Sequence, residues 1–210
     1  MGYDTLRVLV GWKCNLACGY CCNEREEVRG EIPYVGPTDF NPNEYQCVCI
    51  SGGEPLMSTE YIARVRDIAE RVTNPKTYVV LYTNGLYLTR EIAEKLVKWG
   101  VDAINVGLHS EANPDVKPER GGYPAAFEAI ILRVTAATEG LALSVRFHVN
   151  EKFARFGANA RMYPGCEFKY WTMDDCDRGN ETRVALEEFS PWAGREKLCQ
   201  ITPLSKTTGR

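Results

Sequence analysis

Short apolar or alternating segments, separated by helical patterns, constrain the fold of this 210-residue chain most strongly. Six such segments are expected to form strands, at residues 6–11, 46–51, 77–83, 102–108, 141–149 and 167–172. Three helices are expected, from Ser58 to about Val72, from Thr89 to Gly100 and from Pro124 to Gly140. Strands that alternate with helices predict parallel βα units. Six units are too few for an eight-stranded barrel of ~250 residues. We therefore predict an α/β fold, a partial (β/α)6 barrel whose parallel sheet is open on one side.

The expected strands have one apolar and one polar face. Residues 141–149 alternate most regularly, with Phe147 and Val149 on the apolar face and Arg146 and His148 on the polar face. In a barrel of this kind helices cover the outside, so apolar positions point outward and polar positions line the interior. Active chemistry belongs at the carboxyl ends of the strands.

Two parts of the chain fit this pattern poorly. A long helix within residues 22–45 is forbidden by Pro33, Gly36, Pro37 and Pro42. We expect a short helical turn near 23–28, followed by a loop. After Met173 the chain is polar, with a short helix expected near 181–189. The predicted organisation is a core of residues 1–172 and a short C-terminal extension, 173–210, that is not an independent domain.

Composition excludes several classes of function. No apolar run approaches the ~20 residues that span a bilayer, so no membrane association is expected. The N-terminus has no signal-peptide pattern, and the nine cysteines are an odd number, which together predict a reducing, cytoplasmic location. The net charge is −3 and no long basic block exists, so the sequence does not favour an extended nucleic acid as partner. It predicts no oligomeric state.

Three cysteines within eight residues are the first functional signal. Cys14, Cys18 and Cys21 can supply three thiolates to a [4Fe–4S] cluster, which leaves one iron open for chemistry. Structural zinc would require a fourth ligand, normally from a second cysteine or histidine pair, and the chain holds only two histidines. A disulfide framework is disfavoured because a chain of this length can bury a core without one.

A second motif follows the strand expected at 46–51. Gly52-Gly53-Glu54-Pro55 follows the apolar residues 47–50, with only Ser51 between them. With the three-cysteine spacing and Tyr20 before the third cysteine, this motif resembles the radical S-adenosylmethionine (radical SAM) family. Shorter matches, such as Thr83-Asn84-Gly85, extend the resemblance from about Leu6 to Trp171. The family places a proper helix within residues 22–45, and this chain departs from it there.

The resemblance implies a reaction and its cofactors. S-adenosylmethionine (SAM) would bind the open iron of the [4Fe–4S] cluster and be reductively cleaved to a 5′-deoxyadenosyl radical, which abstracts hydrogen from substrate. The electron would come from a donor of the flavodoxin or ferredoxin type. Candidate SAM contacts are Gly52, Gly53, Glu54 and Pro55 for the methionine amino group, Tyr20 for adenine, Arg146 or Arg120 for the carboxylate, His109 and Ser110 for the ribose, and Asn84 as a weaker candidate.

The substrate is less constrained than the chemistry. We expect a small molecule, of nucleotide or nucleoside-like character, because basic interior positions could meet a phosphate. Candidate contacts are Lys13, His148, Asn150, Lys169, Trp171, Asp174 and Asp175. Alternatives are an activating enzyme for a glycyl-radical partner, suggested by Tyr20-Cys-Cys-Asn23, a peptide-modifying enzyme, and a non-catalytic iron–sulfur protein.

The other cysteines add little to the functional reading. Cys47 and Cys49 share a strand face and are expected to be small buried residues. Cys166, Cys176 and Cys199 could hold an auxiliary cluster, but their spacing does not match such extensions well. We favour a single cluster.

Overall fold

The computed structural model describes residues 4–18, 21, 23, 26–108, 125–150, 167–171 and 181–186. Its strands are β1 (Thr5–Leu9), β2 (Tyr34–Val35), β3 (Cys47–Ser51), β4 (Tyr78–Thr83), β5 (Ala103–Leu108), β6 (Ser144–Asn150), β7 (Glu167–Trp171) and β8 (Glu181–Leu186). Its helices are α1 (Glu26–Glu31), the short 3-10 helix η2 (Pro42–Glu44), α2 (Thr59–Arg71), α3 (Arg90–Lys98) and α4 (Ala125–Thr138). The cysteines at 166, 176 and 199, and the candidates Asp174 and Asp175, lie outside the described residues.

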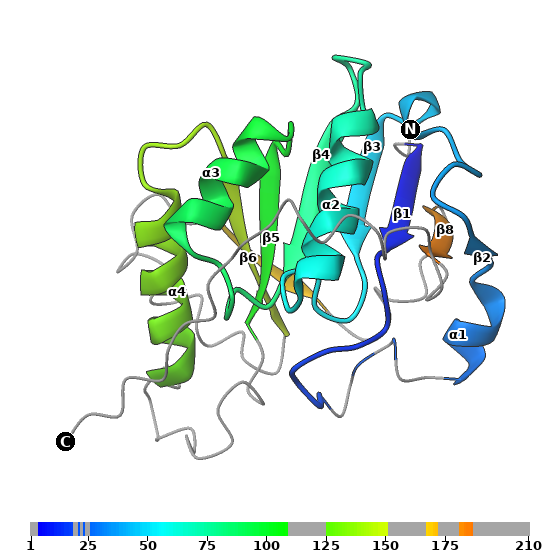
Figure 1. Ribbon diagram of the computed structural model, residues 1–210. Helices are drawn as coiled ribbons and strands as arrows, with labels where there is room; N and C mark the ends of the chain where they lie inside the picture. Colours follow the sequence, from blue (N-terminus) through cyan, green and yellow to red (C-terminus); the bar gives the residue numbers. More distant parts are fainter. Residues whose placement is uncertain are drawn as a thin grey trace.

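The strands form one sheet in the order β2-β8-β1-β3-β4-β5-β6-β7, with parallel pairing throughout. The six expected strands are β1 and β3 to β7, and they lie side by side in chain order. Helices α2, α3 and α4 cover the same face of this sheet (Figure 1). Sequential order with helices on one face is the winding of a barrel segment, whereas a doubly wound sheet has helices on both faces. The predicted open α/β partial barrel is confirmed.

The two faces of the sheet differ as the alternation predicted. Ile104, Val106 and Leu108 of β5 and Phe147 and Val149 of β6 are buried in the main core, which α2, α3 and α4 complete. The opposite face carries charged, polar and small side chains, including Arg7, Cys47, Cys49, Tyr82 and Asn105. We call this opposite face the inner face.

The expected helix ends are also found. The Ser58 hydroxyl accepts a hydrogen bond from Tyr61 N, and the Thr89 hydroxyl accepts one from Ile92 N. Gly100 has a φ of 89°, which suits the left-handed turn that ends α3. In the described part of the chain, none of the helices is both long and apolar enough to cross a membrane.

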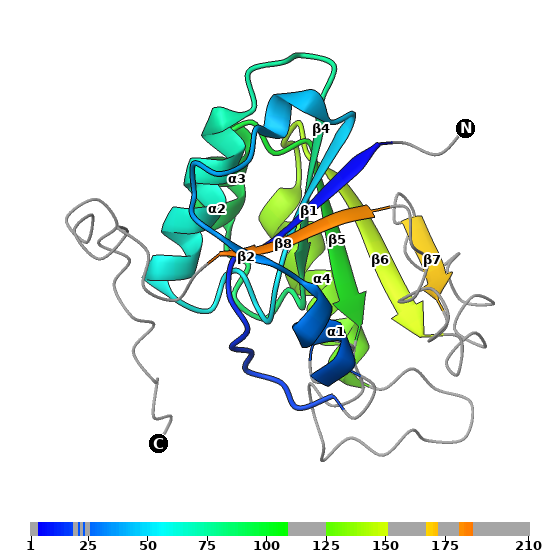
Figure 2. The same ribbon diagram turned by 90° about the vertical axis from the view of Figure 1, so that its right-hand side faces the viewer.

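The helix expected near 181–189 is wrong. Residues 181–186 form β8, which lies between β2 and β1 and pairs with both in parallel (Figure 2). Local propensity is weak here, and the exposed edge of β1 supplies the ladder that decides the conformation. The sheet therefore includes residues that we had placed in the C-terminal extension.

Smaller differences lie in other connections. The helical turn expected near 23–28 is α1, which runs from Glu26 to Glu31. The two-residue strand β2 was missed because it is too short to show any periodicity. Strand β6 begins at Ser144 rather than Leu141, because the turn after α4 takes up the first residues.

Candidate functional site

The three-cysteine loop begins where β1 ends, at the carboxyl edge of the sheet. Val10 N donates to Ser51 O at 2.9 Å, which continues the pairing of β1 with β3 beyond Leu9. Cys14 is exposed, Cys18 and Cys21 are partly exposed, and all three are in the reduced form. Cys21 N donates to Cys18 O at 2.9 Å, so the last two cysteines share one turn.

This loop has the donor chemistry that an iron–sulfur cluster requires. Three soft thiolates lie within one short loop, and Leu16 N lies 3.4 Å from Cys14 Sγ, the kind of N–H···S contact that tunes cluster ligands. Within the described ranges, no three metal-binding side chains converge on one centre. Because metal binding is commonly coupled to the ordering of its ligands, the three thiols fit the cluster and would come together around it.

The Gly52-Gly53 turn holds the start of this loop. Gly53 N donates to Gly11 O at 2.8 Å, and Glu54 N donates to Lys13 O at 2.9 Å. A Cβ atom on Gly53 would lie 1.9 Å from Lys13 O, so no other residue fits without displacing the loop. Gly52 has a φ of 140°, and its carbonyl accepts from Asn23 Nδ2 at 2.6 Å. The glycine pair therefore clamps the cysteine loop to the end of β3.

Helix α2 supports the same junction from the core side. The Tyr61 hydroxyl accepts from Lys13 N at 3.3 Å, and its ring occupies the space that a side chain at Gly11 would need. Arg64 is fully buried and donates from Nη1 to Val10 O at 2.6 Å. The path from β1 to Cys14 is thus fixed on both sides.

Glu54 is buried beneath this turn, with 1% of its surface exposed. Its Oε1 accepts from Leu56 N at 3.0 Å and from the Thr83 hydroxyl at 2.6 Å, and its Oε2 accepts from Asn84 N at 2.7 Å. Burial raises the pKa of Glu54, against hydrogen bonds that lower it. The carboxylate joins the end of β3 to the end of β4. Its predicted contact with the SAM ammonium stays a prediction.

Asn84 extends this connection to the cysteine loop. Its Nδ2 donates to Asn15 Oδ1 at 2.8 Å, and its own Oδ1 accepts from Leu86 N at 3.0 Å. Asn15 directly follows Cys14, and the Cys14 thiol lies 3.9 Å from the same Asn15 oxygen. The structure therefore gives Asn84 a contact with the cysteine loop. Its predicted role as a weaker SAM contact stays a prediction.

Replacing Asn84 by alanine should loosen the loop without unfolding the protein. The loss of one hydrogen bond costs about 1 kcal/mol, which corresponds to roughly a fivefold change in an equilibrium. We expect iron release from the reconstituted protein to a ferrous chelator to be about fivefold faster. The exposed Lys76→Ala variant serves as control. Equal release rates for Asn84→Ala and wild type would contradict this role.

The structure describes the side chains of some of the other candidate residues but not of all of them. Arg146 of β6 lies on the inner face, 42% exposed, and its Nε is 2.8 Å from Glu167 Oε1. His148 lies on the same face, edge-on to Tyr82 at 5.7 Å between ring centroids. Pro55 is buried in the turn and Lys13 is exposed on the loop. The remaining predicted residues lie outside the described residues or have side chains that are not described: Tyr20, His109, Ser110, Arg120, Asn150, Lys169 and Trp171.

Sequence reasoning missed the supporting residues Asn15, Asn23, Tyr61 and Arg64. Asn15 and Asn23 stand within or just after the cysteine motif, so their position was the available signal. Tyr61 and Arg64 belong to an ordinary amphipathic helix, and nothing in the pattern separates them from its other residues.

Comparisons with known proteins identify a family and several relatives of this chain. A family model described as the Radical SAM superfamily matches residues 8–140. The chain is 34% identical over 126 residues to a GTP 3',8-cyclase of Microcystis aeruginosa, covering 53% of this chain and 36% of that protein. It is 31% identical over 138 residues to an AdoMet-dependent heme synthase of Methanosarcina barkeri, covering 57% and 36%.

Solved structures align more weakly. The radical S-adenosylmethionine methyltransferase TsrM from Kitasatospora setae aligns with a TM-score of 0.49 and 17% identity, over 80% of this chain and 36% of that one. The chain spans 36%, 33% and 58% of three curated GTP 3',8-cyclases that it matches.

Proposed function

Since this chain belongs to the radical SAM superfamily, whose domain implies a [4Fe–4S] cluster and SAM, we propose that it abstracts hydrogen from a small, nucleotide-like substrate. Cys14, Cys18 and Cys21 would hold the cluster. When bound, the cluster and SAM supply a 5′-deoxyadenosyl radical by reductive cleavage of the sulfonium. A flavodoxin- or ferredoxin-type protein would supply the electron.

One observation carries this proposal. The cysteine loop is clamped to the Gly52-Gly53 turn by two backbone hydrogen bonds, Gly53 N to Gly11 O and Glu54 N to Lys13 O. A plain strand-to-helix turn has no need of such a close approach. Here it fixes the start of the cysteine loop at the carboxyl edge of the sheet, next to an inner face that is polar enough to receive a substrate. Radical chemistry needs this fixed placement, because a primary carbon radical attacks almost any C–H bond within reach.

One finding favours a nucleotide, and a second leaves the partner-protein alternative without structural support. The relative named GTP 3',8-cyclase supports a nucleotide by similarity. The glycyl-radical alternative depended on Tyr20-Cys-Cys-Asn23, but Asn23 donates to Gly52 O and so serves the clamp itself. That contact is useful whatever the substrate, and it lends no weight to a protein partner.

Anaerobic turnover tests the proposal. The reconstituted and reduced protein is incubated with SAM and a panel of ribonucleotides and nucleosides, and 5′-deoxyadenosine is quantified by chromatography. We expect wild-type protein to form 5′-deoxyadenosine, and one member of the panel to increase its amount. The Cys14→Ser variant should form none. Iron-loaded wild-type protein that forms no 5′-deoxyadenosine with or without any compound would refute the proposal.

A further inference from the structure

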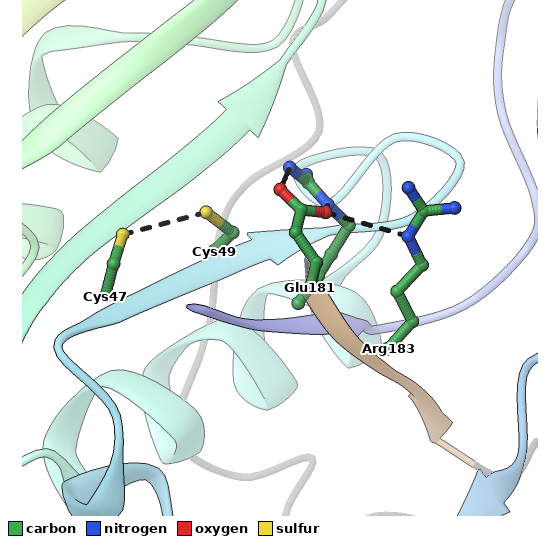
Figure 3. Close-up of polar contacts among 5 residues, drawn as sticks. Cys47, Cys49, Glu181 and Arg183 are labelled. Atoms are coloured by element: carbon green, nitrogen blue, oxygen red, sulfur yellow. Dashed lines mark hydrogen bonds and ion pairs between the residues drawn. The ribbon is translucent and has the colours of Figure 1, made fainter. Parts of the chain in front are cut away.

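Two cysteines of β3 form a close pair on the inner face, apart from the cysteine loop. Cys47 is the first residue of β3 and Cys49 lies two residues further on, so both side chains belong to the same face of the sheet. Their Sγ atoms are 3.8 Å apart. Figure 3 shows the two sulfur atoms turned toward each other. Cys49 is 4% exposed, whereas Cys47 is partly exposed and makes the pair accessible.

The backbone keeps this pair from closing into a disulfide. Neighbours on the same face of a strand lie about 6.6 Å apart, whereas a disulfide needs Cβ atoms about 3.5–4.5 Å apart. Strand β3 is paired with β1 and with β4 at both cysteines, so it cannot shorten without breaking both ladders. The two sulfur atoms are therefore held close together without being able to bond to each other.

The spacing of the sulfur atoms fits one metal ion bound by both. Two Zn–S bonds of about 2.3 Å at the tetrahedral angle span about 3.8 Å between the sulfur atoms. The observed separation is 3.8 Å, so the pair needs little rearrangement to hold such an ion. A linear two-coordinate ion with bonds of the same length would need about 4.6 Å. The geometry therefore favours a tetrahedral, thiophilic ion of the zinc type.

The surroundings of the pair favour the thiolate form that a metal requires. The hydrogen bond from Cys47 lowers the pKa of Cys49, against burial that raises it, and the charge of Arg7 lowers it further. Arg7 is opposite Cys49 in the register, and it is held by Glu181, which accepts from Arg7 Nε at 2.8 Å and from Nη2 at 3.0 Å. The same hydrogen bond between the cysteines raises the pKa of Cys47, because its proton is the one that the sulfur atoms share. A bound metal ion would replace this proton.

The position of the pair separates it from the cluster site. Cys47 lies four residues before Ser51, which is about 13 Å along the strand from the carboxyl edge. Among the residues that the structure describes, no group of three cysteine, histidine, aspartate or glutamate side chains could hold a metal ion. The pair would therefore supply two ligands, and water or a bound molecule would supply the others.

We propose that Cys47 and Cys49 bind a divalent cation of the zinc type as a bidentate dithiolate, with the other coordination positions open on the inner face. This site goes beyond the proposed function and does not depend on the cluster. It rests on that function in one respect, that the inner face receives the substrate. There the ion would offer a position for an oxygen or nitrogen atom of the substrate, at the end of the sheet away from the cysteine loop.

Protection of one peptide from alkylation tests this inference. Trypsin cuts after Arg29 and Arg64 and releases residues 30–64, whose only cysteines are Cys47 and Cys49. The full cluster-loaded protein is incubated anaerobically with Zn²⁺ or Mg²⁺, treated with N-ethylmaleimide, digested and measured by mass spectrometry. We expect Zn²⁺ to slow alkylation of this peptide at concentrations that leave the iron content unchanged. Mg²⁺ should have no effect, because it prefers oxygen ligands.

Removing one of the two thiols should weaken binding of the ion. Loss of a residue that supports a metal ligand costs roughly 10–100-fold in affinity, and loss of a ligand itself should cost at least as much. The Zn²⁺ concentration that half-protects Cys47 should therefore rise by at least about tenfold in Cys49→Ser. Cys199→Ser, which removes a thiol from another part of the chain, is the matched control and should leave this concentration unchanged.

The outcomes separate the inference from the proposed function. Wild-type alkylation that Zn²⁺ does not slow would overturn the inference, as would equal protection of Cys47 in Cys49→Ser and wild type. A disulfide between the two cysteines in peptide 30–64 would also overturn it. Should Cys49→Ser unfold, Cys47→Ser and the wild-type comparison of Zn²⁺ with Mg²⁺ still decide. SAM cleavage without protection by zinc would count against this inference alone, and protection without SAM cleavage against the proposed function alone.

Discussion

Replacing Gly53 by alanine should nearly abolish cluster-dependent chemistry. The added Cβ would lie 1.9 Å from Lys13 O, and that oxygen belongs to backbone that cannot rotate away. The loop must therefore shift by more than an ångström, which breaks the hydrogen bond from Glu54 N to Lys13 O. Misplacement of reacting groups by about 1 Å can cost roughly 100-fold in rate. We expect SAM cleavage to fall by at least about that factor, with reduced iron content after reconstitution.

Gly30→Ala is the matched control for this substitution. Gly30 lies in α1, and a Cβ built there meets nothing within 4 Å. It should keep normal iron content and cleavage, because alanine is also the better helix former. Thermal unfolding of both variants separates a displaced loop from a lost fold. If Gly53→Ala bound iron and cleaved SAM at wild-type rates, the clamp between the turn and the loop would have no functional importance.

The sequence predicts local structure well where periodicity is strong. The six strands in chain order and the helices α2, α3 and α4 follow from patterns that each segment carries by itself. Strand β8 could not be recognised in this way, because its conformation depends on β1, which it joins through pairs such as Arg7 with Arg183. The sequence of residues 181–186 does not show that the edge of β1 is available for pairing.

At the candidate site, too, the sequence shows contiguous motifs but not contacts between distant residues. The cysteines and Gly52-Gly53-Glu54-Pro55 could be found because each motif is contiguous. The contact of Asn84 with Asn15 joins residues 69 positions apart, and that of Arg7 with Glu181 joins residues 174 positions apart. No single-sequence pattern records such pairs. The sequence therefore predicted cofactor contacts for Glu54 and Asn84, which stay predictions, but it could not predict their contacts with the protein.

Removing the carboxylate of Glu54 should have the largest effect on stability. In Glu54→Ala, the buried N–H groups of Leu56 and Asn84 and the Thr83 hydroxyl lose their acceptor. Each unsatisfied group costs about 1–3 kcal/mol, so we expect the three together to lower the free energy of unfolding by about 3 kcal/mol or more. Chemical unfolding under anaerobic conditions measures it. Glu91→Ala, which breaks an exposed pair with Lys95, should cost below about 0.5 kcal/mol.

The pH dependence of Glu54→Gln tests the ionisation of the same group. Burial raises the pKa of Glu54 above its ordinary value of 4.5 in the folded protein, so the folded state binds this proton more strongly than the unfolded state. The resulting stabilisation is complete below the ordinary value and is lost as pH rises through the folded pKa. Wild-type stability relative to Glu54→Gln should therefore decline as pH rises above about 4.5. A difference that stays constant or grows with pH would mean that the three hydrogen bonds outweigh burial and keep the carboxylate ionised.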